Sequence, residues 1–460
     1  MDAFVSRKRR RVEEPNATTS EAKSKATNDL PVDEESTDFK LALLASLHPD
    51  LNEEALLEAL LASDGSVERA SGILIESSTV SPRKRPALGT GYQSSLSSYH
   101  ITTSGVTSPS KRKLTKKGTT LHLYTPEDVE AHTPCSIIHN FLPAGQANAL
   151  LLELLEEAPT YKCLEFQLFE RTVKSPHTFC FYVDSWNEQE QQKTEYIYDG
   201  RKVDDVRRTL PEMRRASGQV ESAVNSEIQR RIREFNSDGK KLKYQSPDQW
   251  KPNTAFVNCY DGPQENVGYH SDQLTYLGPR AVIGSLSLGV AREFRVRKVV
   301  AEDEQYRKDD GSMADAQGQI SIHLPHNSLL IMHAEMQEEW KHSIARAQAI
   351  DPHPLAKNKR LNITYRCYKA NLHPKFTPKC KCGVPAVLRC ATRQKASRGR
   401  YMWMCHTNYV PGQEGCGYFQ WAEFNDDGEP PWADKARVEN MKTDTAKALK
   451  LDNSSLVGYL

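Results

Sequence analysis

The sequence lacks any long hydrophobic run. Only 38% of its 460 residues are hydrophobic, and the mean hydropathy is -0.65. No stretch approaches the roughly 18 apolar residues that a membrane-spanning helix needs, and the N-terminal MDAFVSRKRRR has no apolar signal region. We therefore expect an intracellular protein with no membrane partner, whose ten cysteines are mostly reduced thiols. The low hydropathy also predicts sizeable segments that build no core.

An excess of charge of one sign is also missing, because 61 Lys and Arg residues balance 60 Asp and Glu residues. Three basic clusters nevertheless stand out, and each lies in sequence rich in Ser, Thr and Pro: 7–11, 83–85 and 111–117. Such runs are typical of nuclear import signals or phosphate contacts, and a solvated linker is the alternative for any single run. Three together favour a location in the nucleus.

Changes of composition along the chain predict a multidomain protein. We expect disorder in the basic N-terminus (1–37) and in a polar linker (78–118), with a small helical bundle (38–77) between them. A large globular domain (119–373), a cysteine-rich module (378–425) and a C-terminal tail (426–460) follow. The strand-like runs SIIHNFL, TFCFYV, TAFVNCY, VIGSLSL and LNITYRCY fall in the globular domain, which a polar insertion at 302–319 interrupts.

Residues 38–77 carry helical periodicity in three short pieces, each with a stripe of apolar side chains. A bundle of this size has a marginal core, so an exposed apolar surface on it suits a partner. The segment resembles the CUE ubiquitin-binding domain. Leu47 and Pro49 fall where that family carries Met-Phe-Pro, and Leu74-Ile75 where it carries a di-leucine. The resemblance implies that these four residues bind ubiquitin, and a plain helical adaptor is the alternative.

A second partner is suggested by the linker. Its stretch QSSLSSYH (93–100) approximates the pattern by which peptides bind sliding clamps: Gln, then an aliphatic residue, then two aromatic residues. His100 stands in place of the second aromatic residue. We therefore name the sliding clamp as a candidate partner, with a chance match in a linker rich in Ser and Tyr as the alternative.

The stretch NVGYHSDQ (266–273) contains a candidate metal site. Side chains two apart on a strand point to the same side, so His270 and Asp272 project together. Two histidines and one carboxylate, with the remaining positions open, are the ligands of non-haem Fe(II) that activates oxygen. The best third ligand is His342 in EEWKHSIAR, and the alternatives are His323, His326 and His333.

The stretch RLNITYR (360–366) divides at period two into a polar and an apolar face. The polar face carries Arg360, Asn362, Thr364 and Arg366, and the apolar face carries Leu361, Ile363 and Tyr365. Two arginines and two hydrogen-bonding residues on one side suit a small dianion. Asn258 and Tyr260 also share a face, shortly before the metal motif. A surface strand is the alternative, which the apolar opposite face disfavours.

These motifs, N-x-Y, H-x-D, H and R-x-N-x-T-x-R, occur in an order that resembles the AlkB family of 2-oxoglutarate-dependent dioxygenases. Over 119–373 the resemblance implies a double-stranded β-helix (jelly roll) with helices packed outside. It implies iron at His270, Asp272 and His342. It implies 2-oxoglutarate at Asn258, Tyr260, Arg360, Asn362 and Arg366.

The resemblance also implies an activity: oxidative demethylation of alkylated bases in DNA, of the 1-methyladenine and 3-methylcytosine type, coupled to decarboxylation of 2-oxoglutarate by O2. The base must be flipped out of its stack or lie in a single strand. RNA demethylation and a catalytically inactive adaptor are the alternatives. The family's nuclear repair members place an acidic residue directly after H-x-D, whereas this chain has Gln273. Glu293 is the candidate substitute for that contact with the base.

The cysteine-rich module supplies four thiols for a closed tetrahedral zinc site, with Cys390 as a competitor: Cys380, Cys382, Cys405 and Cys416. Its Gly-Arg-Tyr at 399–401 and its Cys-Gly-Tyr-Phe-Gln-Trp at 416–421 resemble the GRF-type zinc finger, which implies binding of single-stranded nucleic acid. Arg400 beside Tyr401 and Trp403, together with other basic residues of the module, fits phosphate attraction and base stacking. A purely structural zinc site is the alternative.

Overall fold

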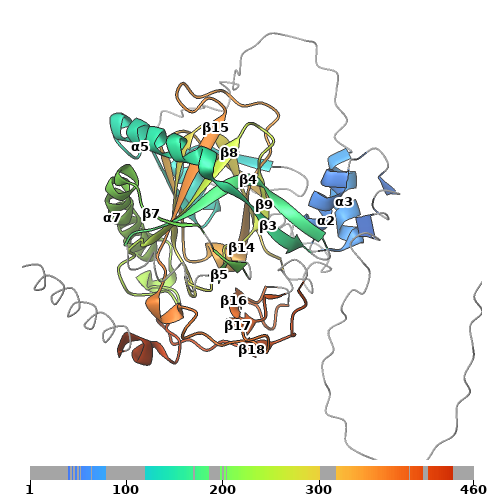
Figure 1. The fold of residues 1–460 in the computed structure, drawn as a ribbon, viewed down its shortest axis with the longest axis vertical. Helices are drawn as coiled ribbons and strands as arrows, with labels where there is room; N and C mark the ends of the chain where they lie inside the picture. Colours follow the sequence, from blue (N-terminus) through green and yellow to red (C-terminus); the bar gives the residue numbers. More distant parts are fainter. Residues whose placement is uncertain are drawn as a thin grey trace, which may run out of the picture. The chain divides into compact units, whose positions relative to one another are not determined.

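The structure is a computed structural model, and it describes most of the globular part of the chain (Figure 1). The described residues are 40–41, 44, 47–48, 51, 53–63, 65–78, 120–168, 171–185, 197–198, 201–203, 205–300, 318–392, 394–407 and 413–438. The predicted disordered segments, the three basic clusters and the clamp-like stretch lie outside these residues, and so does nearly all of the polar insertion. Among the helices that are described, none has the length and apolar character that crossing a membrane requires.

The N-terminal helical segment contains α2 (Glu53–Ala62) and α3 (Val67–Ser78), and residues 40, 41, 44 and 47 are also helical. The predicted apolar stripes form its core, which includes Leu44, Leu56, Leu60 and Ala70. Leu74 belongs to this core as well, so the prediction that Leu74 contacts ubiquitin is wrong for this conformation. Leu47 is 54% exposed, whereas Pro49 and the side chain of Ile75 lie outside the described residues.

The large globular domain predicted at 119–373 contains two sheets, as a jelly roll requires. The larger sheet has eight strands in the order β2-β13-β10-β15-β8-β4-β3, with β7 beside β4. Their bounds are β2 (Cys135–His139), β3 (Lys162–Leu168), β4 (Arg171–Val183), β7 (Val206–Arg208), β8 (Thr254–Asp261), β10 (Ile283–Gly289), β13 (Ser328–Met332) and β15 (Lys359–Arg366). All five strand-like runs of the sequence are confirmed as strands of this sheet.

The smaller sheet has five strands in the order β1-β12-β11-β14-β9. Their bounds are β1 (Thr120–Leu123), β9 (Val267–His270), β11 (Arg292–Lys298), β12 (Gln319–Leu324) and β14 (Trp340–Ile344). The polar insertion predicted at 302–319 therefore falls in the connection between β11 and β12, whose strands pair antiparallel. A two-stranded sheet of β5 (Ile197–Tyr198) and β6 (Arg201–Lys202) lies outside both.

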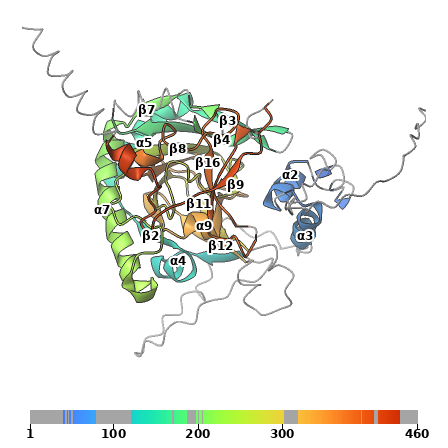
Figure 2. The same cartoon turned by 90° about the horizontal axis from the view of Figure 1, so that it is seen from below.

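Two helices cover one face of the large sheet, as Figures 1 and 2 show: α5 (Ala144–Glu157) and α7 (Pro211–Glu234). Their buried residues recur at helical spacing, for example Leu150 and Leu154 on α5 and Val220 and Val224 on α7. These side chains pack on the apolar face of β15, and the Tyr365 hydroxyl donates a hydrogen bond to the Met213 carbonyl at 3.2 Å. The other face of the large sheet thus turns toward the small sheet.

A second core fills the space between the two sheets. It contains Leu330 of β13 from the large sheet, and Phe294 of β11 and Ile344 of β14 from the small one. The alternation of side chains along each strand explains both cores, because neighbouring residues such as Leu329 and Leu330 enter different ones. The other helices of the oxygenase domain within the described residues are α4 (Pro126–His132), α9 (Met336–Glu339), η2 (Ala158–Thr160), η3 (Ser237–Gly239) and η5 (Ala370–Leu372).

The cysteine-rich module forms a three-stranded sheet of β16 (Val387–Cys390), β17 (Tyr401–Met404) and β18 (Phe419–Trp421). Leu388 and Trp403 of this module belong to the same buried cluster as the residues between the two sheets. The chain stays packed beyond it, since Ala436 is buried and the Trp432 indole N–H donates to the Asn371 carbonyl at 2.8 Å. The prediction of a tail from residue 426 is therefore wrong up to residue 438, the last one described.

Candidate metal centre and co-substrate site

His270, Asp272 and His342 come together in the structure. His270 ends β9, and the antiparallel pairing of β9 with β14 sets His342 directly beside it. The Nε2 atoms of His270 and His342 lie 3.6 and 3.4 Å from Asp272 Oδ1. The potential ligand atoms of all three residues lie within 4.8 Å of one another, which is the grouping that a single metal ion needs.

The three alternative histidines have other neighbours. The ring of His323 lies 5.6 Å from that of Tyr124, and His326 Nδ1 accepts a hydrogen bond from the Gly289 backbone N–H. His333 Nε2 lies 3.0 Å from Ser136 Oγ. Within the described part of the chain, His342 alone joins the H-x-D pair as a third ligand.

Hydrogen bonds prepare these ligands for a cation. The Gly268 carbonyl lies 2.8 Å from His270 Nδ1. Because a carbonyl oxygen only accepts hydrogen bonds, Nδ1 carries the proton, and Nε2 keeps a lone pair for a metal. Burial, and then the neighbouring His342, lowers the pKa of His270 to about 4, so the imidazole is neutral at pH 7. Burial would raise the pKa of Asp272, but Arg366 and both histidines hold it well below its usual range. Two imidazoles and one carboxylate fit Fe(II).

The polar face of β15 pairs with β8, and it carries the predicted co-substrate residues. Asn362 stands opposite Asn258, and Arg360 stands opposite Tyr260. Leu361 and Ile363 point away, into the core under α5 and α7. The division of this strand into two faces is thereby confirmed, and its polar side faces the space between the sheets.

Arg360 has hydrogen-bonding capacity that the protein does not use. Its side chain is only 1% exposed and donates from Nη2 to Ser287 Oγ at 2.8 Å, while Nε and Nη1 are buried without a hydrogen-bond partner. Burial lowers the pKa of Arg360 to about 10. Its guanidinium carbon lies 5.3 Å from the centroid of the Tyr260 ring. A carboxylate could accept a hydrogen bond from either of these nitrogens, so this site fits one end of 2-oxoglutarate.

Asn362 and Arg366, also predicted to bind the co-substrate, have partners within the protein. Asn362 Nδ2 donates to Ser285 Oγ and to the Leu286 carbonyl, at 2.8 and 3.2 Å. Arg366 donates from Nε and Nη2 to Asp272 Oδ2, at 3.1 and 2.5 Å. In this structure Asn362 therefore stabilises the wall of the site, and Arg366 holds a metal ligand.

Two residues near the centre carry no motif, and sequence reasoning missed them. The ring of His177 on β4 stacks on Tyr260, with centroids 4.7 Å apart, and burial lowers the pKa of His177 to about 4. Gln337 on α9 accepts the backbone N–H of Asp272 at Oε1, at 2.7 Å. The only signal in the sequence is a polar residue near an otherwise apolar run, which does not reveal its long-range partner.

The prediction that Glu293 contacts the base is wrong for this conformation. Phe294, its neighbour on β11, stacks on His342 with ring centroids 5.3 Å apart, so Phe294 lies on the metal side of the sheet. Glu293 therefore points to the opposite side, where it forms an ion pair with Arg295 at 2.8 Å. Sequence spacing could not decide this, because a shift of one residue exchanges the two faces.

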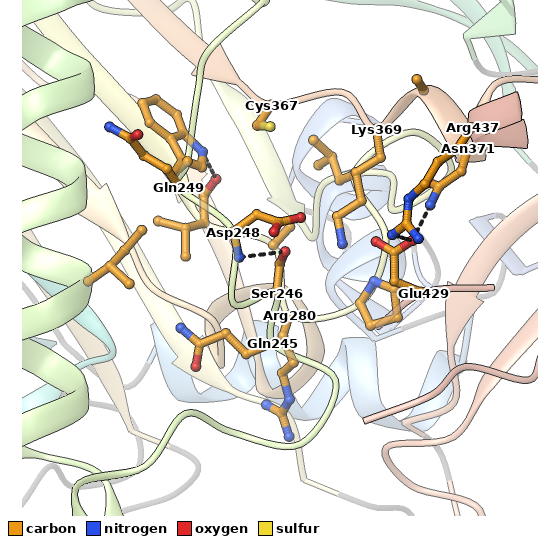
Figure 3. Close-up of a pocket in the computed structure, with 17 residues that line it drawn as sticks. Gln245, Ser246, Asp248, Gln249, Arg280, Cys367, Lys369, Asn371, Glu429 and Arg437 are labelled. Atoms are coloured by element: carbon orange, nitrogen blue, oxygen red, sulfur yellow. Dashed lines mark hydrogen bonds and ion pairs between the residues drawn. The ribbon is translucent and has the colours of Figure 1, made fainter. Parts of the chain in front are cut away.

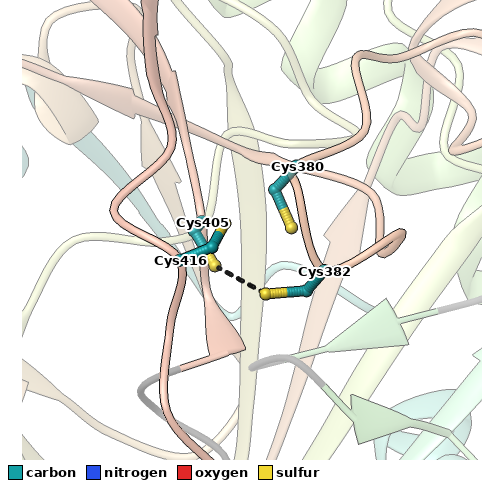
Figure 4. Close-up of side chains that lie close together, drawn as sticks. All are labelled: Cys380, Cys382, Cys405 and Cys416. Carbon is teal, nitrogen blue, oxygen red and sulfur yellow. Dashed lines mark hydrogen bonds between the residues drawn. The ribbon is translucent and has the colours of Figure 1, made fainter.

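The four predicted zinc ligands also come together (Figure 4). Their sulfur atoms all lie within 4.8 Å of one another, and the Cys382 and Cys405 sulfurs are 4.0 Å apart. Zn–S bonds of about 2.3 Å in a tetrahedron need sulfurs roughly 3.8 Å apart, so the group fits zinc. Desolvation acts to raise the pKa of Cys416, but backbone N–H groups of Tyr418 and Cys382 lower it to about 6. Cys390 lies outside this group.

Tyr401 and Trp403 do not present their rings to a nucleic acid, which corrects a second prediction. They are 3% and 1% exposed, because β17 turns them toward the core of the oxygenase domain. The exposed aromatic surface of the module lies elsewhere. The Arg400 guanidinium sits 3.8 Å from the centroid of the Trp421 ring, and the half-exposed Phe419 packs edge-on against Trp421.

Figure 3 shows the residues that line a pocket of about 310 Å³. No predicted site residue lines it. The Lys369 ammonium is buried there without a hydrogen-bond partner, and burial lowers its pKa. Asp248 and Glu429 line the same pocket as Lys369 and Arg280. The lining thus carries both signs of charge and favours neither an anion nor a cation.

The two-sheet fold, the His-Asp-His group and the arginine on the facing strand define a non-haem iron site. The sequence model of the 2OG-Fe(II) oxygenase superfamily matches residues 134–366, and the chain belongs to this superfamily. The family implies Fe(II), 2-oxoglutarate and O2 as its cofactors and co-substrates.

Similar curated proteins include the DNA oxidative demethylase ALKBH2 of Arabidopsis thaliana, 30% identical over 122 residues. Alpha-ketoglutarate-dependent dioxygenase alkB homolog 3 of Homo sapiens is 31% identical over 114 residues. Each match covers 25% of this chain, and 37% and 36% of the two relatives. A solved structure, "The structure of OsALKBH1", aligns with 17% identity and a TM-score of 0.35, over 51% of this chain and 98% of that one.

Proposed function

We propose that the protein is an AlkB-type dioxygenase that removes methyl groups from alkylated bases in DNA, of the 1-methyladenine and 3-methylcytosine type. The observation that carries this proposal is the His270, Asp272 and His342 group, set in one interior with a buried Arg360 that has two unpartnered nitrogens. The similarity to ALKBH2 and alkB homolog 3 supports the choice of a nucleic-acid substrate.

Iron with 2-oxoglutarate supplies the oxidising chemistry, in which O2 converts the co-substrate to succinate and CO2 while the methyl group is hydroxylated and leaves as formaldehyde. The chain positions the reactants. Arg360 binds one carboxylate of 2-oxoglutarate, beside Tyr260 and the His177 ring stacked on it. Arg366 holds Asp272 Oδ2, which directs Oδ1 toward the two histidines.

Binding of a single strand is assigned to the surface of the cysteine module. Arg400 over Trp421, with Phe419 beside it, combines a cation for phosphate with aromatic faces for bases. Zinc at the four cysteines would hold β17 and the following loop in place. Ubiquitin binding through the exposed Leu47, contact with a sliding clamp and a nuclear location remain proposals that rest on the sequence alone.

The test is mass spectrometry of oligonucleotides that carry 1-methyladenine or 3-methylcytosine, incubated with Fe(II), 2-oxoglutarate and O2. We expect loss of one CH2 unit from the base, with equal amounts of succinate and formaldehyde. Matched oligoribonucleotides separate the DNA activity from the RNA alternative. His342→Ala is the control and should abolish both products. If 2-oxoglutarate is consumed while no methylated DNA or RNA changes mass, the substrate assignment fails.

A further inference from the structure

Residues 271–280 follow His270, and we call them the ligand loop because they contain Asp272. The ligand loop is hydrogen-bonded to α9 and to the first residue of β14. Ser271 Oγ donates to the Trp340 carbonyl at 3.0 Å, and the Arg280 backbone N–H donates to Glu338 Oε1 at 2.7 Å. Together with the bond from Asp272 N–H to Gln337, these contacts attach both ends of the ligand loop to one short piece of chain.

The cysteine module also contacts α9, and it contacts the ligand loop itself. The Tyr401 hydroxyl donates to Glu338 Oε1 at 2.9 Å, and the Leu388 backbone N–H donates to Thr275 Oγ1 at 3.2 Å. Arg398 Nη2 donates to the Val299 carbonyl at 2.5 Å. The module thus makes hydrogen bonds to α9, to the ligand loop and to the residue that follows β11.

Apolar packing reinforces this attachment. Leu274 and Leu277 of the ligand loop share one buried cluster with Leu388, Tyr401 and Trp403 of the module. A surface that reads nucleic acid keeps its aromatic faces accessible to the bases. These aromatic rings are instead enclosed, and they cover a loop that carries a metal ligand.

Glu338 connects the two sets of contacts. Its carboxylate is buried, Oε1 receives hydrogen bonds from Arg280 N–H and Tyr401, and Oε2 has no partner. A buried carboxylate depends strongly on its few donors, so the Tyr401 hydroxyl fixes where Glu338 lies. Gln337 is the adjacent residue on α9, and its side chain holds the Asp272 backbone.

We propose that the cysteine module is a structural part of the metal centre, in which Tyr401 acts as a positioning residue for Asp272 through Glu338 and Gln337. The module would thus set metal affinity in addition to any contact with nucleic acid. This inference rests on the proposed function in one respect: it takes His270, Asp272 and His342 as the metal ligands.

The test measures metal affinity directly and needs no methylated substrate. The full chain, with zinc in the cysteine site, is titrated with Mn(II) and followed by electron paramagnetic resonance, because Mn(II) prefers oxygen and nitrogen ligands to thiolates. Tyr401→Phe removes the hydroxyl and keeps the ring. We expect it to weaken Mn(II) binding about tenfold, as outer-shell partners of metal ligands do.

Tyr418→Phe is the matched control, because the Tyr418 hydroxyl bonds only within the module, to Gln420 Oε1 at 2.5 Å. It should leave the Mn(II) affinity unchanged. Gln337→Leu should weaken Mn(II) binding as Tyr401→Phe does, and the double variant should be no worse than the worse single one, because both act along one path. Thr275→Val, which removes the acceptor for Leu388 N–H, provides a second and milder variant should Tyr401→Phe not fold.

Unchanged Mn(II) affinity in folded Tyr401→Phe, or effects of the two variants that simply add, would overturn the proposal and leave Tyr401 a purely structural residue. Failure of the metal assignment itself has another signature. His342→Ala should abolish the Mn(II) signal, and if it does not, the ion sits elsewhere and the proposed function fails at its first step.

Discussion

Arg366 directs two donors, Nε and Nη2, at a single oxygen atom of Asp272, its Oδ2. The other carboxylate oxygen is left to face His270 and His342. The arginine at the end of β15 therefore orients a metal ligand that lies in the loop after β9, a strand of the other sheet.

We predict that Arg366→Lys weakens both metal and co-substrate binding. Lysine keeps the charge but cannot direct two fixed N–H groups at one oxygen, so Asp272 loses its orientation. The Fe(II) concentration needed for half-maximal activity and the KM for 2-oxoglutarate should both rise, or activity should be lost. Steady-state kinetics at varied 2-oxoglutarate, with metal titration in parallel, provide the measurement. A variant with wild-type values of both would remove Arg366 from the site.

Arg360→Met should separate folding stability from co-substrate binding. Two nitrogens of Arg360 are buried without partners, so replacing it by an apolar side chain removes a desolvated charge. We expect the ligand-free Tm to stay level or rise, while 2-oxoglutarate no longer raises it. Loss of the carboxylate partner should cost about 2–5 kcal/mol of binding free energy. Lys359→Met, at a partly exposed neighbour, should still respond to 2-oxoglutarate, and a lower Tm together with normal binding for Arg360→Met would contradict this assignment.

Glu338 should make stability depend on pH. Burial raises its pKa from 4.5 to about 7, which means that the folded state binds this proton more tightly than the unfolded state. Its favourable contribution is therefore complete below pH 4.5 and is lost as the pH rises to about 7. Glu338→Gln cannot lose a proton, so its stability relative to wild type should increase by about 3 kcal/mol across that window. Denaturant unfolding at several pH values measures this difference, and a constant difference would argue against a buried, titrating Glu338.

Substitutions in the cysteine module should divide into two classes. Trp421→Ala removes a partly exposed ring next to Arg400, and it should weaken binding to a single-stranded oligonucleotide by about 1–3 kcal/mol at unchanged Tm. Trp403→Ala removes a ring from the core and should cost about 3–5 kcal/mol of folding free energy. Fluorescence anisotropy at two salt concentrations and thermal unfolding distinguish the classes. Equal binding defects without any loss of stability in Trp403→Ala would restore Trp403 as a contact to bases.

Local periodicity predicted the parts of the site that lie on single strands. The period-two division of 360–366 gave the correct polar face, because one strand determines it. The prediction for Glu293 failed, because the side to which its side chain points depends on the register of β11 against β14 and not on β11 alone. His177 and Gln337 remained invisible for a related reason: their partners, Tyr260 and the Asp272 backbone, lie far away in sequence.

The cysteine module shows the same limit at the level of domains. Its Gly-Arg-Tyr and cysteine spacing predicted the four sulfurs that meet, because those constraints are internal to the module. The burial of Tyr401 and Trp403 comes from docking against another part of the chain, and no pattern within 378–425 specifies that surface. The resemblance therefore located the module and misassigned two of its aromatic residues.

The core between the sheets has a consequence for the synthesis of this chain. The last jelly-roll strand ends at Arg366, yet Leu274 and Leu277 belong to a buried cluster that is complete only when Leu388 and Trp403 have left the ribosome. Until then the nascent oxygenase domain exposes apolar surface around the loop that holds Asp272, and such surface invites aggregation or chaperone binding. An expression fragment cut at residue 373 would stay permanently in that state. A fragment that keeps this packing therefore includes the cysteine module with Leu388 and Trp403.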